Sequence, residues 1–120
     1  MTMSKGAATS GAPSLDPREA AQLVEEGALL LDVRELDEWQ AGHVVDALHL
    51  PLGSLVAEVD RVPLGRQVVC VCRAGGRSGQ AADWLVQGGY DAWNLAGGMQ
   101  AWAAAGLPFV DAEGAPGTVI

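Results

Sequence analysis

Short apolar runs alternate with helix-like segments along this chain, and that alternation limits the folds it can adopt. Four runs bounded by glycine, proline or charged residues are predicted to be strands, over residues 28–33, 47–50, 67–71 and 92–95. Helices are expected from Asp16 to Gly27 and over residues 35–41, 52–60, 78–87 and 99–104. Strands joined by helices form βαβ units, whose sheet is mostly parallel and covered on both faces. The predicted fold class is therefore α/β.

The composition is that of a globular domain and argues against two classes of partner. The chain has 120 residues, 49% of them apolar and 18% charged, which fits one domain with a hydrophobic core. Its net charge of −8 argues against nucleic acid or an anionic membrane, since both attract basic surfaces. We find no apolar signal segment and no run near the ~20 residues that span a bilayer, and so expect a cytoplasmic protein.

Cys72 directly follows the third predicted strand and begins a short loop that is rich in arginine and glycine. Residues 68–79 are V-V-C-V-C-R-A-G-G-R-S-G, and a helix is expected to begin at Ser78. Loop amides and the positive end of that helix would then surround the sulfur. Helix N-termini and adjacent arginines lower a cysteine pKa from ~8.5 to roughly 3.5–7.5. We therefore predict that Cys72 is a thiolate at neutral pH and acts as a nucleophile.

The residues around Cys72 suggest how the loop binds an anion. Gly75 and Gly76 permit the tight backbone, with positive φ, that such a cradle needs. Arg73 and Arg77 carry planar guanidinium groups that match sulfonate, sulfate or phosphate. Arg77 could instead pair with an acid to hold the shape of the loop, and both roles remain open. Cys70, in mid-strand between two valines, is interpreted as a buried and inert thiol.

Polar residues also follow the first predicted strand. Asp32 and Arg34 lie at its carboxyl end, where ligands collect in open α/β sheets, and Asp32 is expected to orient Arg34 or Arg77. The acidic run that follows is interpreted as a solvated helix face; its members are Glu35, Asp37 and Glu38. The two histidines, His43 and His49, lack metal-ligand spacing and are expected to be structural.

Two stretches of the chain resemble a single-domain rhodanese. The stretch L-L-L-D-V-R-E-L-D-E-W-Q-A-G-H-V-V-D-A-L-H-L-P resembles the first half of such a domain. The second half is similar to V-V-C-V-C-R-A-G-G-R-S-G-Q-A-A-D-W-L followed by G-Y-D-A-W-N-L-A-G-G-M-Q-A-W-A-A-A-G-L-P. The resemblance implies a three-layer α/β/α sandwich around a five-stranded sheet, with a short first strand near residues 12–15. It covers a domain over residues 15–108. Residues 1–14 are small, polar and interrupted by glycine and proline, and are predicted to be a flexible leader, and residues 109–120 are predicted to be an irregular tail.

The resemblance also implies a reaction. Cys72 would take a sulfane sulfur from a small anionic donor such as thiosulfate, hold it as a persulfide and pass it to cyanide, a thiol or a protein acceptor. The implied substrate-binding residues are those of the loop, namely Arg73, Ala74, Gly75, Gly76 and Arg77. The supporting residues are Asp32, Arg34 and Ser78. Neither a metal nor an organic cofactor is expected, and the protein is expected to be a monomer.

Two other functions fit parts of the same pattern. A phosphatase or arsenate reductase uses a similar thiolate, but those relatives have a loop one residue longer than the six residues from Cys72 to Arg77. A rhodanese-like domain could also bind a partner or carry a persulfide without turning over. The sulfurtransferase prediction is preferred because Cys72 and both arginines are present.

Overall fold

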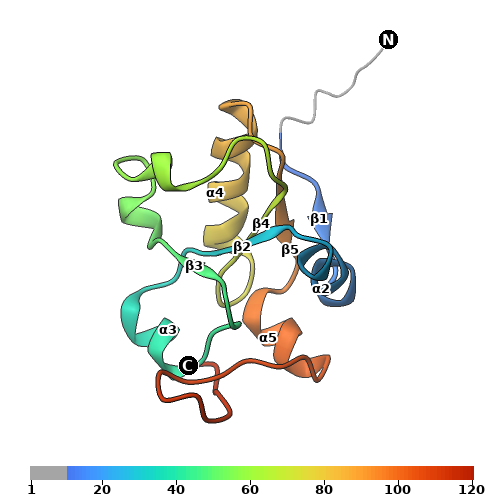
Figure 1. Cartoon of the computed structure of the whole chain (residues 1–120), viewed down its shortest axis with the longest axis vertical. Helices are drawn as coiled ribbons and strands as arrows, with labels where there is room; N and C mark the ends of the chain where they lie inside the picture. Colours follow the sequence, from blue (N-terminus) through green and yellow to red (C-terminus); the bar gives the residue numbers. More distant parts are fainter. Residues whose placement is uncertain (1–10) are drawn as a thin grey trace.

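The computed structural model describes residues 11–120, in which five strands form one all-parallel sheet (Figure 1). The strands are β1 (Ser14–Leu15), β2 (Leu29–Asp32), β3 (Leu48–His49), β4 (Val68–Val71) and β5 (Ala92–Leu95). Their order in the sheet is β1-β5-β4-β2-β3, which places β4 at the centre. The predicted α/β fold and the short first strand are both confirmed.

Within residues 11–120, three α-helices and two short 3₁₀ helices connect the strands, and a fourth α-helix follows the last strand. The helices are α2 (Pro17–Glu25), α3 (Leu36–Ala41), α4 (Gly76–Gln87) and α5 (Gly98–Ala104), with η1 (Leu52–Ser54) and η2 (Val59–Arg61). The prediction of one helix over residues 52–60 is therefore wrong. Gly53 and Ser54 are weak helix formers in the first turn, and two tight turns suffice to bury Leu55 against the core.

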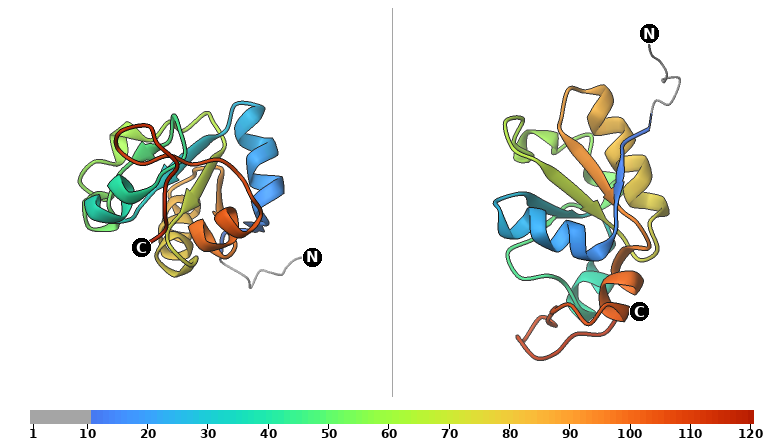
Figure 2. Two further views of the ribbon diagram at one scale, coloured as in Figure 1. Left: turned by 90° about the horizontal axis from the view of Figure 1, so that it is seen from below. Right: turned by 90° about the vertical axis from the view of Figure 1, so that its right-hand side faces the viewer.

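The sheet separates two hydrophobic layers, as the alternation of side chains along a strand requires. Leu31, Cys70 and Cys72 pack on one face with the apolar side of α4 and the 3₁₀ helices. Leu30 and Val69 point to the other face, which α2 and α5 cover. Figure 2 shows α2 and α4 on opposite sides of the strands. The arrangement is the predicted three-layer sandwich, and it leaves the carboxyl ends of β2 and β4 at one edge.

Residues 1–10 lie outside the described residues, so most of the predicted leader is not tested. The predicted leader boundary at residue 14 falls within β1, because Ser14 pairs with Asn94 of β5. Just before it, the Ala12 amide donates to Asp83 Oδ1 over 2.6 Å. The N-terminal packing of the domain thus begins before residue 15.

The tail over residues 109–120 is irregular, as predicted, but it packs against the domain. Val110 forms an antiparallel bridge with His43, with both amide hydrogen bonds 2.8 Å long. The Thr118 amide donates to Ala41 O over 2.9 Å. A Cβ placed on Gly42 would lie 2.6 Å from Thr118 O, so only glycine permits this approach. The tail (red in Figure 1) is therefore attached to the end of α3.

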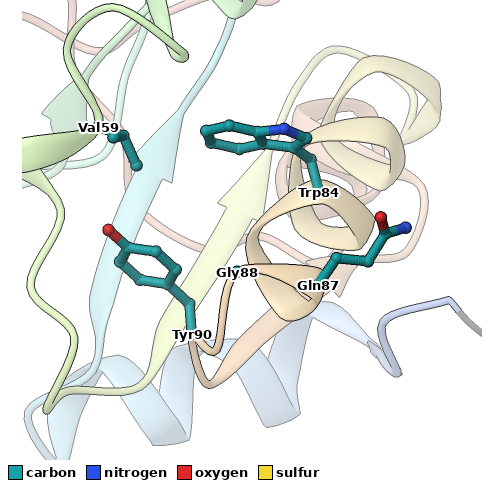
Figure 3. Close-up of a pocket in the computed structure, with 5 residues that line it drawn as sticks. All are labelled: Val59, Trp84, Gln87, Gly88 and Tyr90. Carbon is teal, nitrogen blue, oxygen red and sulfur yellow. The ribbon is translucent and has the colours of Figure 1, made fainter.

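Two further features of the described residues concern surfaces away from the predicted site. Over residues 11–120, each helix is too short or too polar to cross a bilayer. A shallow hollow of about 370 Å³ lies where α4 ends, lined by the aromatic rings of Trp84 and Tyr90 (Figure 3). Its lining includes none of the predicted site residues.

Candidate active site

Cys72 lies at the carboxyl end of the central strand, beside the end of β2. Asp32 pairs in register with Val71, and the Val33 amide donates to Val71 O over 3.0 Å. The loop then turns through Gly75, whose φ of +111° lies in the left-handed region, and α4 begins at Gly76. The helix thus starts two residues earlier than predicted. Ser78 lies in its first turn, next to the sulfur.

The N-terminus of α5 donates backbone hydrogen bonds to the loop that begins at Cys72. The Met99 amide donates to Cys72 O over 2.8 Å, and the Gln100 amide donates to Arg73 O over 3.0 Å. Gly98, with φ of +58°, makes this approach possible, because a Cβ there would overlap the carbonyl group of Arg73. The sequence Gly97-Gly98 is therefore part of the structure that positions Cys72, in addition to forming a turn.

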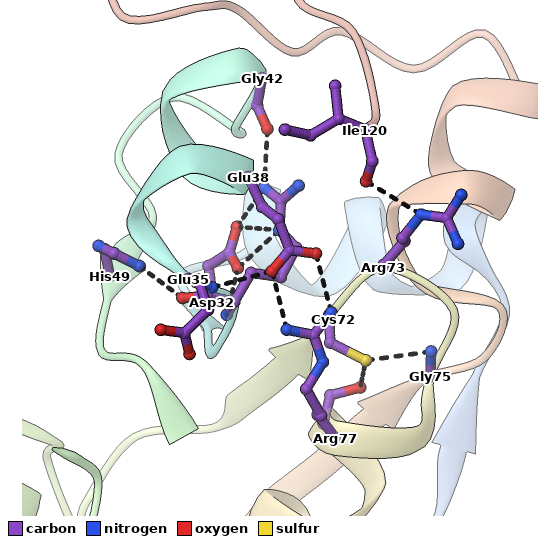
Figure 4. Close-up of polar contacts among 12 residues, drawn as sticks. Asp32, Glu35, Glu38, Gly42, His49, Cys72, Arg73, Gly75, Arg77 and Ile120 are labelled. Carbon is purple, nitrogen blue, oxygen red and sulfur yellow. Dashed lines mark hydrogen bonds and ion pairs between the residues drawn. The ribbon is translucent and has the colours of Figure 1, made fainter. Parts of the chain in front are cut away.

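The Cys72 sulfur accepts two hydrogen bonds from the loop and helix that follow it (Figure 4). The Gly75 amide lies 3.1 Å from Sγ, and the Ser78 hydroxyl lies 3.3 Å from it. Burial by itself raises the pKa of Cys72, but the Ser78 hydroxyl and the amides of Ser78, Gly75 and Ala74 outweigh it, so the pKa is lowered. The direction is the one that the sequence predicts.

Cys70 has the opposite environment, as predicted. It is completely buried in the layer under α4, and its thiol is free. Desolvation, with a smaller contribution from the nearby Cys72, raises the pKa of Cys70 to about 12. Cys70 in β4 and Cys72 just after it thus differ in acidity because only Cys72 reaches the loop amides.

Asn94, a residue that sequence reasoning missed, connects Ser78 to the loop. From β5, its Oδ1 accepts a 2.7 Å hydrogen bond from the Ser78 hydroxyl. Its Nδ2 donates to Gly75 O over 3.1 Å. Asn94 therefore contacts both residues that donate to the sulfur. Its position in a plain strand, in the sequence A-W-N-L-A-G-G, gives no signal of this role.

Arg77 forms a bidentate ion pair with Glu38 of α3. The two N–O distances are 2.8 and 2.9 Å, and Glu38 Oε1 also accepts from the Glu35 amide. The pair lowers the pKa of Glu38 to about 2, chiefly through the hydrogen bonds from Arg77. Glu38 is only 13% exposed, so the prediction of a solvated acidic face is wrong for this residue. The sequence left the acid partner of Arg77 open, with Asp32 as one candidate. In the structure the partner is Glu38.

Asp32 instead pairs with Arg34, the other partner that the sequence predicted. Both side chains are buried, and Arg34 Nη2 lies 2.7 Å from Asp32 Oδ2 and 2.7 Å from Gly42 O. Arg34 Nη1 has no hydrogen-bond partner within residues 11–120. This pair fixes the residue that ends α3, and α3 in turn carries Glu38. Asp32 and Arg34 thus support the loop indirectly, through α3 and Arg77.

Arg73 points away from this network. Its Nε donates to Ile120 O over 2.9 Å, so the active-site loop is tied to the tail (Figure 4). Arg73, Ala74 and Gly76 form the exposed rim of the loop, whereas Cys72 is 1% exposed at its base. The loop therefore surrounds the sulfur with its backbone, while the Arg73 side chain faces the tail and the Arg77 side chain faces Glu38.

The two histidines pack against one tryptophan, as their predicted structural role requires. The rings of His43 and His49 stack on Trp39 with centroid distances of 3.9 and 4.8 Å. His43 Nδ1 donates to Trp39 O, and His49 Nε2 donates to Arg34 O. Both rings are used to hold α3 and the segment that follows it.

Comparison with known proteins agrees with this geometry. The model of the rhodanese-like domain family matches residues 16–105. The chain belongs to the rhodanese family. A protein named sulfurtransferase from Allochromatium vinosum is 44% identical over 90 residues, covering 74% of this rhodanese and 84% of the relative. Thiosulfate sulfurtransferase GlpE from Pseudomonas savastanoi pv. phaseolicola is 36% identical, covering 66% and 84%.

Solved structures show the same fold. A rhodanese-related protein from Thermoplasma volcanium superposes with a TM-score of 0.78 at 26% identity, covering 82% of this chain and 97% of that one.

Another relative by sequence is the Bacillus subtilis protein named putative sulfur carrier protein YrkF. It is similar over a shorter stretch, at 29% identity, covering 55% of this rhodanese and 36% of that protein.

Proposed function

We propose that this rhodanese is a sulfurtransferase that forms a persulfide on Cys72. The donor is a small anion such as thiosulfate, and the acceptor is cyanide in the assay and a small or protein thiol in the cell, with the protein acting as a monomer. One observation carries the proposal. A buried cysteine sulfur accepts hydrogen bonds from the Gly75 amide and the Ser78 hydroxyl, and its pKa is lowered.

The chemistry follows from the charge that this environment stabilises. Cys72 Sγ, as a thiolate, attacks the outer sulfur of thiosulfate; the sulfur–sulfur bond of the donor breaks and sulfite leaves with the electron pair. The charge then rests on the terminal sulfur of the persulfide, within reach of loop amides and the N-terminus of α4. The acceptor attacks that terminal sulfur, and the thiolate of Cys72 is regenerated.

Access to Cys72 requires a small movement of its surroundings. The residue is 1% exposed, while Arg73 and Ala74 on the rim of the loop are exposed. The pKa of Arg77 is raised, chiefly by its hydrogen bonds to Glu38, with a smaller contribution from the charge of Cys72. Arg73 on the rim carries a positive charge, although its Nε donates to Ile120 O, and the charge of Arg77 is shared with Glu38. The rim therefore favours an anionic donor such as thiosulfate over a neutral one.

A second function, that of a persulfide carrier, is supported by the same burial. A sulfur that is almost completely covered would be protected from stray acceptors between loading and delivery. The carrier and the enzyme share the persulfide and differ in turnover. The thiocyanate produced per protein molecule separates them, because a carrier delivers one sulfur for each loading by a partner.

The test is intact mass spectrometry after incubation with thiosulfate, followed by a thiocyanate assay with cyanide. We expect one added sulfur, removable by a thiol reductant, and catalytic formation of thiocyanate. Cys72→Ser should abolish both, and the matched variant Cys70→Ser should retain both, because Cys70 is buried and its pKa is raised. Phosphate release from an aryl phosphate without sulfur uptake would contradict the proposal and favour a phosphatase.

A further inference from the structure

The Ser78 hydroxyl lies between two acceptors that compete for its proton. Its Oγ is 3.3 Å from Cys72 Sγ and 2.7 Å from Asn94 Oδ1. A hydroxyl has one proton, so it can make a full hydrogen bond to only one of them at a time. Ser78 is completely buried, so exchange with bulk water does not relieve this competition.

The orientation of the Asn94 amide is fixed by the loop itself. Nδ2 donates to Gly75 O over 3.1 Å, which leaves Oδ1 facing Ser78. The reversed orientation would place two oxygens against each other at Gly75, which neither could satisfy. Asn94 Oδ1 can therefore only accept, and Ser78 is the residue that donates to it.

We propose that Asn94 is a positioning residue whose Oδ1 accepts the hydrogen bond of the Ser78 hydroxyl whenever the Cys72 sulfur does not carry the negative charge. This inference rests on the proposed persulfide chemistry. In the free thiolate, the Ser78 hydroxyl bonds to charged Sγ, which is the stronger acceptor. When thiosulfate has delivered its sulfur and sulfite has left, Sγ is a neutral divalent sulfur and the charge lies on the terminal atom. The hydroxyl then rotates to Asn94, and no proton changes its covalent partner.

The consequence is that Asn94 stabilises the persulfide relative to the free thiolate. Without it, the buried Ser78 hydroxyl would have no strong acceptor in the persulfide state, and its bond to the thiolate would have no competitor. Over residues 11–120, the titratable groups whose pKa the charge of Cys72 affects are Arg77 from α4, which is paired with Glu38 of α3, and Cys70 from β4. Asn94 is neutral at every pH, so its replacement alters the hydrogen bond without adding or removing charge.

The experiment measures the pH dependence of Cys72 alkylation by iodoacetamide in the full chain, using Asn94→Leu, Ser78→Ala and the double variant. Asn94→Leu should alkylate faster than the wild type below the titration midpoint by about 2- to 12-fold, the range that one hydrogen bond spans. Ser78→Ala should alkylate more slowly, and the double variant should match Ser78→Ala. Asn94→Ala provides the same test if leucine prevents folding.

A second readout uses the persulfide directly. At a fixed ratio of thiosulfate to sulfite, intact mass should show a smaller loaded fraction for Asn94→Leu, with the loading equilibrium reduced by about 2- to 12-fold. The inference is overturned if Asn94→Leu slows alkylation, or if the double variant is slower than Ser78→Ala, since Asn94 would then act by holding Gly75. If the wild type takes up no sulfur, the proposed function fails, and the role of Asn94 in persulfide formation fails with it. The alkylation series then reports only whether Asn94 competes for the Ser78 proton.

Discussion

The ion pair between Glu38 and Arg77 should contribute to the free energy of unfolding, and stability measurements can test this contribution. Glu38→Gln keeps the shape of the side chain and removes its charge. The amide can replace at most one of the two hydrogen bonds from Arg77, which are 2.8 and 2.9 Å long. Because this pair joins α3 to the loop that holds Cys72, its loss should lower the free energy of unfolding and loosen the loop.

The magnitude follows from the titration of Glu38. Its pKa falls from 4.5 to about 2, which at ~1.36 kcal/mol per pKa unit sets an upper limit of roughly 3.4 kcal/mol. The Arg77 side chain is 35% exposed, and solvent screens such a pair, so we expect about 1–2 kcal/mol. Since the pKa of Glu38 is depressed, this contribution is complete above pH 4.5 and is lost as the pH falls toward 2.

The assay is urea unfolding followed by tryptophan fluorescence, at several pH values from 7 to 3. The matched control is Glu58→Gln, which breaks an exposed pair with Arg61 whose side chains are 45% and 52% exposed. That loss should stay below about 1 kcal/mol. The wild type and Glu38→Gln should differ most at pH 7 and converge as the pH approaches 2. A difference that is independent of pH, or no larger than the control, would refute the reasoning.

Two glycines give further predictions, with Gly65→Ala as the control because a Cβ there meets nothing within 4 Å. Gly98→Ala should displace the backbone of Cys72, lower the free energy of unfolding by more than about 1 kcal/mol and slow sulfur uptake in the intact-mass assay. Gly117→Ala should push the tail away and free Arg73 from Ile120, because its Cβ would lie 2.8 Å from the Cα of Gly42, the residue that follows α3. The KM for thiosulfate should then fall several-fold with kcat unchanged; an unchanged KM would mean that Arg73 does not meet the donor.

The sequence predicted those parts of the fold whose residues are compatible with only one structural environment. A run such as residues 28–33 is apolar on both faces, and only a central strand of a covered sheet accommodates it. Cys72 was found because a strand, a glycine-containing loop and a helix must place amides around the residue at their junction. Cys70 was separated from it by position alone, and the structure confirms this difference.

The missed features are contacts between residues far apart in the chain. Glu38 belongs to a run of acids on one short helix, and no pattern indicates which of them faces Arg77, 39 residues later. Asn94 occupies an ordinary strand position and gains its role only because β5 lies beside β4. The tail has no periodicity, so its contact with Arg73 could not be predicted. The helix expected over residues 52–60 failed because apolar spacing alone cannot distinguish one helix from two turns.

The titration of Cys72 tests the central claim most directly. In Cys70→Ser protein, alkylation by iodoacetamide across the pH range reports only the Cys72 thiolate. The account predicts a midpoint below the ~8.5 of a free cysteine, and a shift toward higher pH in Ser78→Ala. A midpoint at or above that of a free cysteine would contradict it, because burial would then outweigh the hydrogen bonds from Gly75 and Ser78.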